Sequence, residues 1–217
     1  MARIFGGTQA LMIDDRRKWK VPGIQKAHDF LAAFPHSQLH GILTCNYDLL
    51  IEYALGTNGF NYGKPGLVLV GRGKNPQFPW HFIPVKLTGD MPLAKLHGSI
   101  SWDDSNYYTD GRCGVKGTAL IVPPIPEKVA PDSLESTWSL AGSLLSRTTK
   151  LLVFGFAFNL YDTALLNFLR DKGAGIRSVL LVNTNPPVQP AREIWPHADV
   201  TACQPPPDGE DCLRAWI

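Results

Sequence analysis

The chain has 217 residues, of which 44% are hydrophobic and 18% charged, which is typical of one large or two small globular domains and argues against disorder. The formal net charge is +2, and no basic block extends beyond Arg16-Arg17-Lys18, so we expect no nucleic-acid-binding surface. The chain shows no N-terminal signal pattern, no apolar run of the roughly 18 residues that a membrane span needs, and no C-x-x-C pair among its four cysteines. These absences predict a cytoplasmic protein with free thiols, without a membrane segment and without structural zinc.

Short apolar runs between turn residues predict the elements of the first part of the chain. Helices are expected where helical composition ends at Pro35 and at Gly56, and strands where apolar runs end at polar, glycine or proline residues. The predicted helices cover residues 24–34 and 48–55, and the predicted strands cover residues 39–44, 67–70, 93–97 and 119–122.

The last third of the chain has the clearest pattern. A helix is expected over residues 134–147 with Asp132 or Ser133 as its cap, and two continuous apolar runs at 150–155 and 178–183 read as buried parallel strands. A helix over 160–172 would connect them as a right-handed crossover. Residues 199–201 are expected to form a short last strand, and the Pro-rich tail that follows a loop.

Polar or glycine residues follow several of these predicted strands. Open parallel sheets bind ligands beyond the carboxyl ends of their strands, so residues 44–48, His97, Gly155 and Asn183 are candidates for one site. His97 is the best candidate general base, because imidazole titrates near neutrality. Asn46 can hold a water or a sugar hydroxyl. For each residue alone a structural role is favoured, such as helix capping by Asp48.

Four short stretches resemble the SIR2 (sirtuin) superfamily, most closely the bacterial SIR2-like NAD-cleaving domains. The stretches are ILTCNYD at residues 42–48, KLHGS at 95–99, VFGF at 153–156 and VN at 182–183. The threonine, asparagine and aspartate of the family's T-x-N motif fall on Thr44, Asn46 and Asp48, and its catalytic histidine falls on His97. Its nucleotide-contacting glycine falls on Gly155, followed by Phe156, and its asparagine near the adenine-side ribose falls on Asn183.

The resemblance implies a Rossmann-like parallel sheet with flanking helices that binds NAD as a substrate. It implies an NAD glycohydrolase that cleaves NAD to nicotinamide and ADP-ribose, in an antiviral defence system of bacteria. Asn46 would position a water or the nicotinamide ribose, and His97 would bind or deprotonate a ribose hydroxyl. A homo-oligomer and a fused or partner effector stay open.

Two departures from the family change this expectation. Cys113 stands alone where the deacetylating members carry a four-cysteine zinc module, so we expect one SIR2-like domain over residues 1–217 with a reduced, metal-free small lobe within 57–117. Nothing in residues 1–40 matches the G-A-G-x-S loop that cradles the pyrophosphate, so the N-terminal phosphate-loop unit is expected to be missing. The alternative function is therefore a degenerate or truncated nucleotide-binding or protein-interaction module without catalysis; deacylation is a third.

Overall fold

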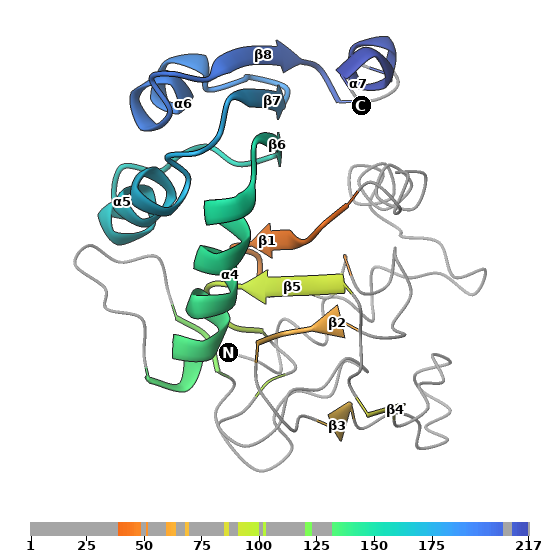
Figure 1. Ribbon diagram of the computed structural model, residues 1–217, viewed down its shortest axis with the longest axis vertical. Coiled ribbons are helices and arrows are strands. Elements are labelled where there is room, and N and C mark those ends of the chain that lie inside the picture. Colours follow the sequence, from red (N-terminus) through yellow and green to blue (C-terminus); the bar gives the residue numbers. More distant parts are fainter. Residues whose placement is uncertain are drawn as a thin grey trace. The chain divides into compact units, whose positions relative to one another are not determined.

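The computed structural model shows an α/β protein whose chain divides into two compact units (Figure 1). One unit comprises residues 1–123 and 130–140, and the other residues 124–129 and 141–217. The structure describes residues 39–48, 51, 60–63, 68–69, 85–86, 91–99, 102, 120–122, 132–205 and 210–216. The expected single domain with a small lobe at 57–117 stays a prediction. The expected helix at 24–34, the phosphate-loop region and most of the helix at 48–55 lie outside the described residues.

The first unit is built around a parallel three-stranded sheet in the order β1-β5-β2. Its strands are β1 (Ile42–Thr44), β5 (Met91–Lys95) and β2 (Phe60–Asn61). Residue 44 of β1 lies opposite residue 95 of β5, so these two strands end at the same level. A separate antiparallel pair consists of β3 (Val68–Leu69) and β4 (Val85–Lys86).

Aromatic and aliphatic side chains fill the core of the first unit. Tyr62 and Trp102 are almost fully buried, and their rings meet edge to face with centroids 5.1 Å apart. Phe60, Leu93 and Leu134 complete this cluster. Leu134 closes the 3-10 turn η2 (Asp132–Leu134), which leads directly into helix α4 (Glu135–Arg147). These elements confirm the helix that the sequence predicted at 134–147.

A second parallel sheet, in the order β6-β7-β8, forms the second unit. It contains β6 (Lys150–Phe154), β7 (Ser178–Val182) and β8 (Asp199–Cys203), and the central strand β7 is buried from its second residue onward. Helix α5 (Thr163–Lys172) connects β6 to β7, and α6 (Val188–Ile194) connects β7 to β8. The predicted order of strand, helix and strand is confirmed, but the helix begins at Thr163 rather than at residue 160, and β6 is not buried as predicted, because its first residue is exposed and the other four are half-buried.

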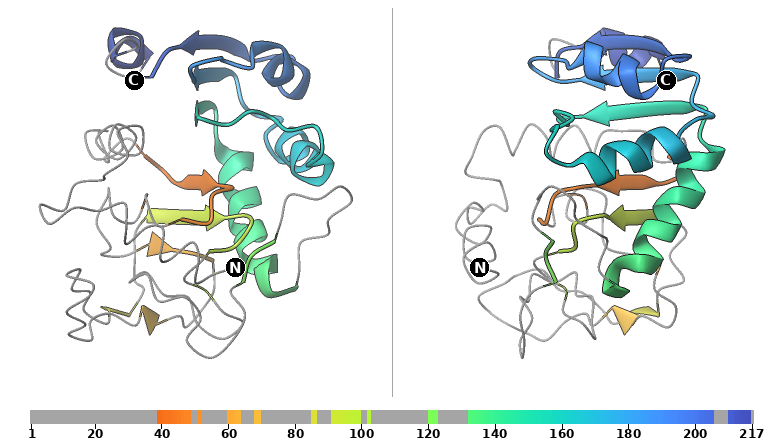
Figure 2. Two further views of the ribbon diagram at one scale, coloured as in Figure 1. Left: turned by 180° about the vertical axis from the view of Figure 1, so that it is seen from behind. Right: turned by 90° about the vertical axis from the view of Figure 1, so that its left-hand side faces the viewer.

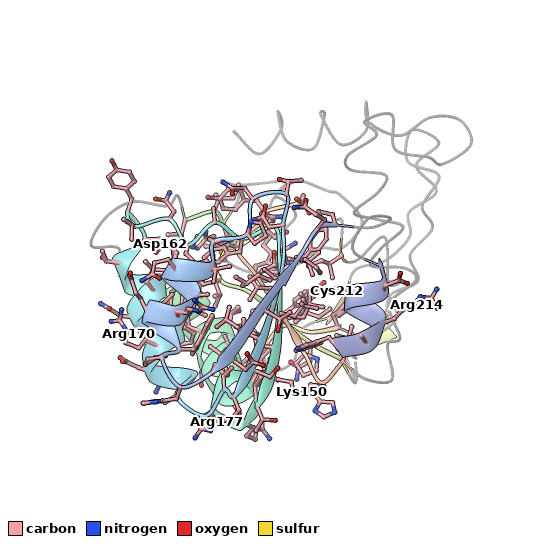
Figure 3. The ribbon with its side chains drawn as sticks, turned by 90° about the horizontal axis from the view of Figure 1, so that it is seen from above. Lys150, Asp162, Arg170, Arg177, Cys212 and Arg214 are labelled. Carbon is pink, nitrogen blue, oxygen red and sulfur yellow. The ribbon has the colours of Figure 1, made fainter. Side chains whose placement is uncertain are left out.

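Helices lie on both faces of this second sheet. Figure 3 shows α5 and α6 on one side of the strands and α7 (Glu210–Trp216) on the other, and the view from behind in Figure 2 shows the same arrangement. Leu165, Leu166 and Leu169 of α5 are buried, as are Ala191 and Ile194 of α6. Because both faces are covered, an almost continuous apolar sequence suits β7.

Three sequence-based boundaries require correction. The tail was predicted to be loop, but residues 210–216 form α7: the prolines end at Pro207, and EDCLRAW contains good helix formers. The strand predicted at 119–122 is reduced to a single antiparallel bridge between Ile121 and Gly98 in the described residues 120–122. The strand predicted at 93–97 ends at Lys95, so His97 lies in the turn that follows.

No sequence-based prediction covered α6, which contains prolines at its start. Pro187 precedes the helix and Pro190 is its third residue. Proline is tolerated there because the first backbone N–H groups of a helix have no partner within it. In the described part of the chain, no helix has the length and apolar character of a membrane span.

Candidate functional site

The first cluster of predicted site residues begins where β1 ends. The hydroxyl of Thr44 accepts a hydrogen bond from the backbone N–H of Asn46 at 3.1 Å, which fixes a tight turn directly after the strand. Asn46 itself is exposed, whereas Thr44 and Asp48 are half-buried. Thr44 therefore stabilises the turn, and Asn46 is the residue of this turn that is exposed to solvent and accessible to a ligand.

His97 lies beside this turn because β1 and β5 are paired in parallel. The backbone N–H of Leu96 donates to the carbonyl of Thr44 at 2.9 Å, which continues the β1–β5 pairing up to the residue before His97. The ring of His97 lies 6.2 Å from the ring of Tyr47, centroid to centroid, at an interplanar angle of 36°. Only 4% of His97 is exposed. The two most specific predicted stretches thus meet at one edge of the sheet.

Three side chains that the sequence did not single out hold the loops of this edge together. Lys95 Nζ donates to the carbonyl of Asp48, and the Ser99 hydroxyl donates to the carbonyl of Tyr47 at 3.2 Å. The Tyr47 hydroxyl in turn donates to the carbonyl of Val122 at 3.2 Å. Each bond joins segments that are far apart in the sequence, so these side chains set the shape of the loops around His97.

The clearest missed sequence feature is Lys95. It interrupts the apolar run Leu93-Ala94-Lys95-Leu96 and is fully buried. A buried ammonium group is costly unless it has partners, so a lysine in such a run indicates a specific contact. Its ammonium also lies 5.9 Å from the centroid of the Trp102 ring. The lysine therefore connects the core of the unit to the loop that carries Asn46.

Gly98 has a structural role at this site. Its φ of +80° is one that glycine adopts readily, and a Cβ atom there would lie 1.9 Å from the carbonyl oxygen of Leu120. The approaching segment is 120–122, whose Val122 backbone N–H donates to the carbonyl of His97 at 2.9 Å. Glycine is thus required here by the protein's own backbone.

In the second unit, Gly155 and Phe156 follow the end of β6. Gly155 has a φ of +65°, and its backbone N–H donates to the carbonyl of Val182 at 3.0 Å. A Cβ atom at Gly155 would meet no heavy atom within 4 Å in the described part of the chain. The ring of Phe156 packs edge to face on Phe158 at 4.7 Å. Gly155 therefore differs from Gly98 in having open space beside it.

Asn183 follows the end of β7, next to Gly155. Its side-chain oxygen accepts the backbone N–H of Asn185 at 3.2 Å and the hydroxyl of Thr184 at 3.4 Å. Its backbone N–H donates to the carbonyl of Cys203 at 3.1 Å. Phe154 of β6 lies opposite Val182 of β7, so Gly155 and Asn183 leave adjacent strands at the same level. Asn183 thus shapes the turn that follows β7.

The predicted site residues consequently form two groups. Thr44, Asn46, Asp48 and His97 gather at the carboxyl ends of β1 and β5 in the first unit. Gly155, Phe156 and Asn183 gather at the carboxyl ends of β6 and β7 in the second. Among the described residues, no three His, Cys, Asp or Glu side chains are arranged to hold a metal ion.

Comparison with known proteins found no matching family model, no matching curated protein and no matching solved structure.

Proposed function

We propose that the chain is an NAD glycohydrolase that cleaves NAD to nicotinamide and ADP-ribose, and that it acts in bacterial antiviral defence. The observation that carries this proposal is the meeting of the Asn46 turn and His97 at the carboxyl ends of the paired strands β1 and β5. The two parallel sheets, with helices α5, α6 and α7 on the second, support a Rossmann-like fold for the chain. NAD is the substrate in this proposal, and no zinc takes part.

The reaction breaks the bond between the anomeric carbon of the ribose and the ring nitrogen of nicotinamide. Both bonding electrons leave with nicotinamide, and water adds its hydroxyl to the anomeric carbon and releases a proton. In this proposal the exposed amide of Asn46 orients the water or a ribose hydroxyl. His97 accepts a hydrogen bond or a proton from a ribose hydroxyl, and its packing against Tyr47 fixes the ring.

Lys95, Ser99 and Tyr47 support this chemistry indirectly. Their hydrogen bonds to backbone carbonyls hold the segments 44–48, 95–99 and 120–122 together. A catalytic pair must keep its separation during turnover, and small displacements lower the rate strongly. These three side chains are positioning residues in the proposal, and Gly155, Phe156 and Asn183 contribute nucleotide binding by the resemblance.

One observation favours a second candidate, a nucleotide- or ADP-ribose-binding module without catalysis. Only 4% of His97 is exposed, whereas a general base has to touch its substrate. A histidine packed in this way can have a purely structural role, in which its backbone hydrogen bond and its ring contact with Tyr47 stabilise the loop. The two candidates differ in whether nicotinamide is released.

The deciding experiment incubates the purified chain with NAD and follows free nicotinamide by chromatography. Wild type should release nicotinamide, and His97→Asn should lower the rate by roughly 10²–10⁴-fold, the usual contribution of a general base. Asn46→Ala should also lower the rate. His197→Ala is the matched control, because His197 is exposed and lies in the second unit.

Circular dichroism of each variant separates loss of activity from loss of fold. Undiminished release from a folded His97→Asn variant refutes the glycohydrolase assignment. If wild type releases nothing but binds ADP-ribose in calorimetry, the binding module replaces the enzyme.

A further inference from the structure

The loop between β6 and α5 exposes two large apolar side chains. Among the residues that the structure describes, Leu160 and Tyr161 are the large hydrophobic residues that are exposed, with relative accessibilities of 73% and 70%. They are consecutive and lie in the turn that precedes α5. Exposure of two adjacent large apolar side chains to water is unfavourable, and such surface often marks a place where another molecule binds. The pair is therefore a candidate for contact with a ligand.

Hydrogen bonds fix the backbone of the turn that carries these two side chains. The side-chain oxygen of Asn159 accepts the backbone N–H of Tyr161 at 3.1 Å, and the carbonyl of Asn159 accepts the backbone N–H of Asp162 at 3.0 Å. The carboxylate of Asp162 then caps α5 by accepting the backbone N–H of Leu165 at 3.3 Å. The turn is thus continuous with the helix. Because its backbone is already ordered, a ligand that binds here does not have to order it, which lowers the entropic cost of binding.

Phe158 anchors the same loop in a strained conformation. Its φ of +52° lies in the left-handed region, which bulky residues rarely adopt. Its side chain is 2% exposed, and its ring packs edge to face on Phe156 at 4.7 Å and on Trp195 at 5.8 Å. This aromatic packing offsets the cost of the strained backbone. Strained residues gather at ligand-binding and catalytic sites, so the strain supports a functional role for this loop.

The loop begins at the edge of the second sheet where a parallel sheet binds ligands. Gly155, the first residue after β6, has open space beside its backbone in the described part of the chain. Asn183 leaves the neighbouring strand β7 at the same level. Ligands of open parallel sheets bind beyond the carboxyl ends of the strands. Leu160 and Tyr161 therefore belong to a loop that starts at the candidate nucleotide site of this unit.

The chemistry of the loop indicates which part of a nucleotide it suits. The N-terminal end of a helix attracts phosphate, but at α5 the carboxylate of Asp162 already occupies that position (Figure 3). A second anion beside this carboxylate is disfavoured by repulsion between like charges. Leu160 and Tyr161 instead offer apolar surface and an aromatic face, which suit an uncharged planar ring. The loop is thus better suited to a nucleobase than to a phosphate.

We propose that Leu160 and Tyr161 are the base-binding residues of the second unit, and that the ring of Tyr161 stacks on the adenine of NAD and of ADP-ribose. This inference rests on the proposed function, in which His97 of the first unit acts at the nicotinamide ribose and the second unit binds the remainder of the nucleotide. Adenine is uncharged and planar, as the loop requires. Leu160 contributes apolar contact beside the stacked ring and excludes water from it.

Titration calorimetry of the full-length chain with two ligands tests this inference. Tyr161→Ala should weaken ADP-ribose binding by about tenfold or more, the effect of losing one base stack. Tyr161→Phe keeps the aromatic face and should stay within a factor of about three of wild type. Nicotinamide mononucleotide contains no adenine, so its affinity should be the same for all three proteins. Asn167→Ala is the matched control, because Asn167 is an exposed residue of α5 outside the turn.

The outcomes separate this inference from the proposed function. Unchanged ADP-ribose affinity in a folded Tyr161→Ala variant overturns the base-binding role, while ADP-ribose binding by wild type leaves the proposed function in place. Weaker binding of nicotinamide mononucleotide alone assigns Tyr161 to the other ring and also overturns the inference. A wild-type chain that binds no ADP-ribose overturns both. Circular dichroism checks the fold, and Leu160→Ala, which should also weaken ADP-ribose binding, provides the test if Tyr161→Ala does not fold.

Discussion

The two glycines that follow predicted strands, Gly98 in the first unit and Gly155 in the second, have very unequal room for a side chain. Gly98 and Gly155 have nearly the same φ, +80° and +65°, but different surroundings. Alanine at Gly98 would bring its Cβ to 1.9 Å from the carbonyl oxygen of Leu120, whereas Gly155 has open space. We therefore expect Gly155→Ala to lower the free energy of unfolding by about 1 kcal/mol, from backbone strain alone. Gly98→Ala should lower it by roughly 3 kcal/mol, because the clash with Leu120 adds to the same strain. Urea unfolding of both variants measures the difference, and equal losses would contradict the role of the Leu120 contact.

Among the secondary-structure elements, α5 depends on its cap. Only 3% of Asp162 is exposed. Its carboxylate accepts the backbone N–H of Leu165 at 3.3 Å, in the first turn of the helix. Asp162→Ala should cost about 1 kcal/mol of stability, because that N–H has no partner within the helix. Asp162→Asn keeps an acceptor and should recover most of the loss. Asp171→Ala, in the exposed last turn of the same helix, is the control in thermal unfolding. An equal loss in the control would show that the cap is not the cause.

For the molecule as a whole, ligand binding and catalysis should respond to different residues. The proposed function assigns nucleotide contact to Asn183 and chemistry to His97. Asn183→Asp keeps the side-chain oxygen that accepts from Asn185 but loses the amide donors. We expect it to weaken ADP-ribose binding about tenfold, the effect of about one hydrogen bond. His97→Asn should leave the affinity within about a factor of three while nicotinamide release falls. Titration calorimetry measures both, and absence of any heat with wild type would reject nucleotide binding.

The parts of the fold that the sequence predicted correctly depend on local patterns. Continuous apolar runs at β6 and β7, separated by a helical segment, specify a parallel unit without reference to distant residues, although only β7 is buried. The strand before Asn46 was also readable from its apolar run. The predictions failed where local composition was misleading. The short apolar run at residues 119–122 was predicted as a strand although its strand pairing depends on distant residues, and the prolines of the tail concealed the helix that follows them.

The amino-acid sequence by itself determined the class of the fold, the parallel unit of β6, α5 and β7, and the residues with suitable chemistry at the strand ends. Tertiary structure alone decided that His97 lies in a turn beside Tyr47 and that Lys95 reaches the carbonyl of Asp48. The physical reason is the sequence separation over which each effect acts. Apolar periodicity and turn chemistry act between residues that are a few positions apart. Contacts such as that between Lys95 and Asp48, 47 residues apart, exist only after strand pairing has brought the two segments together.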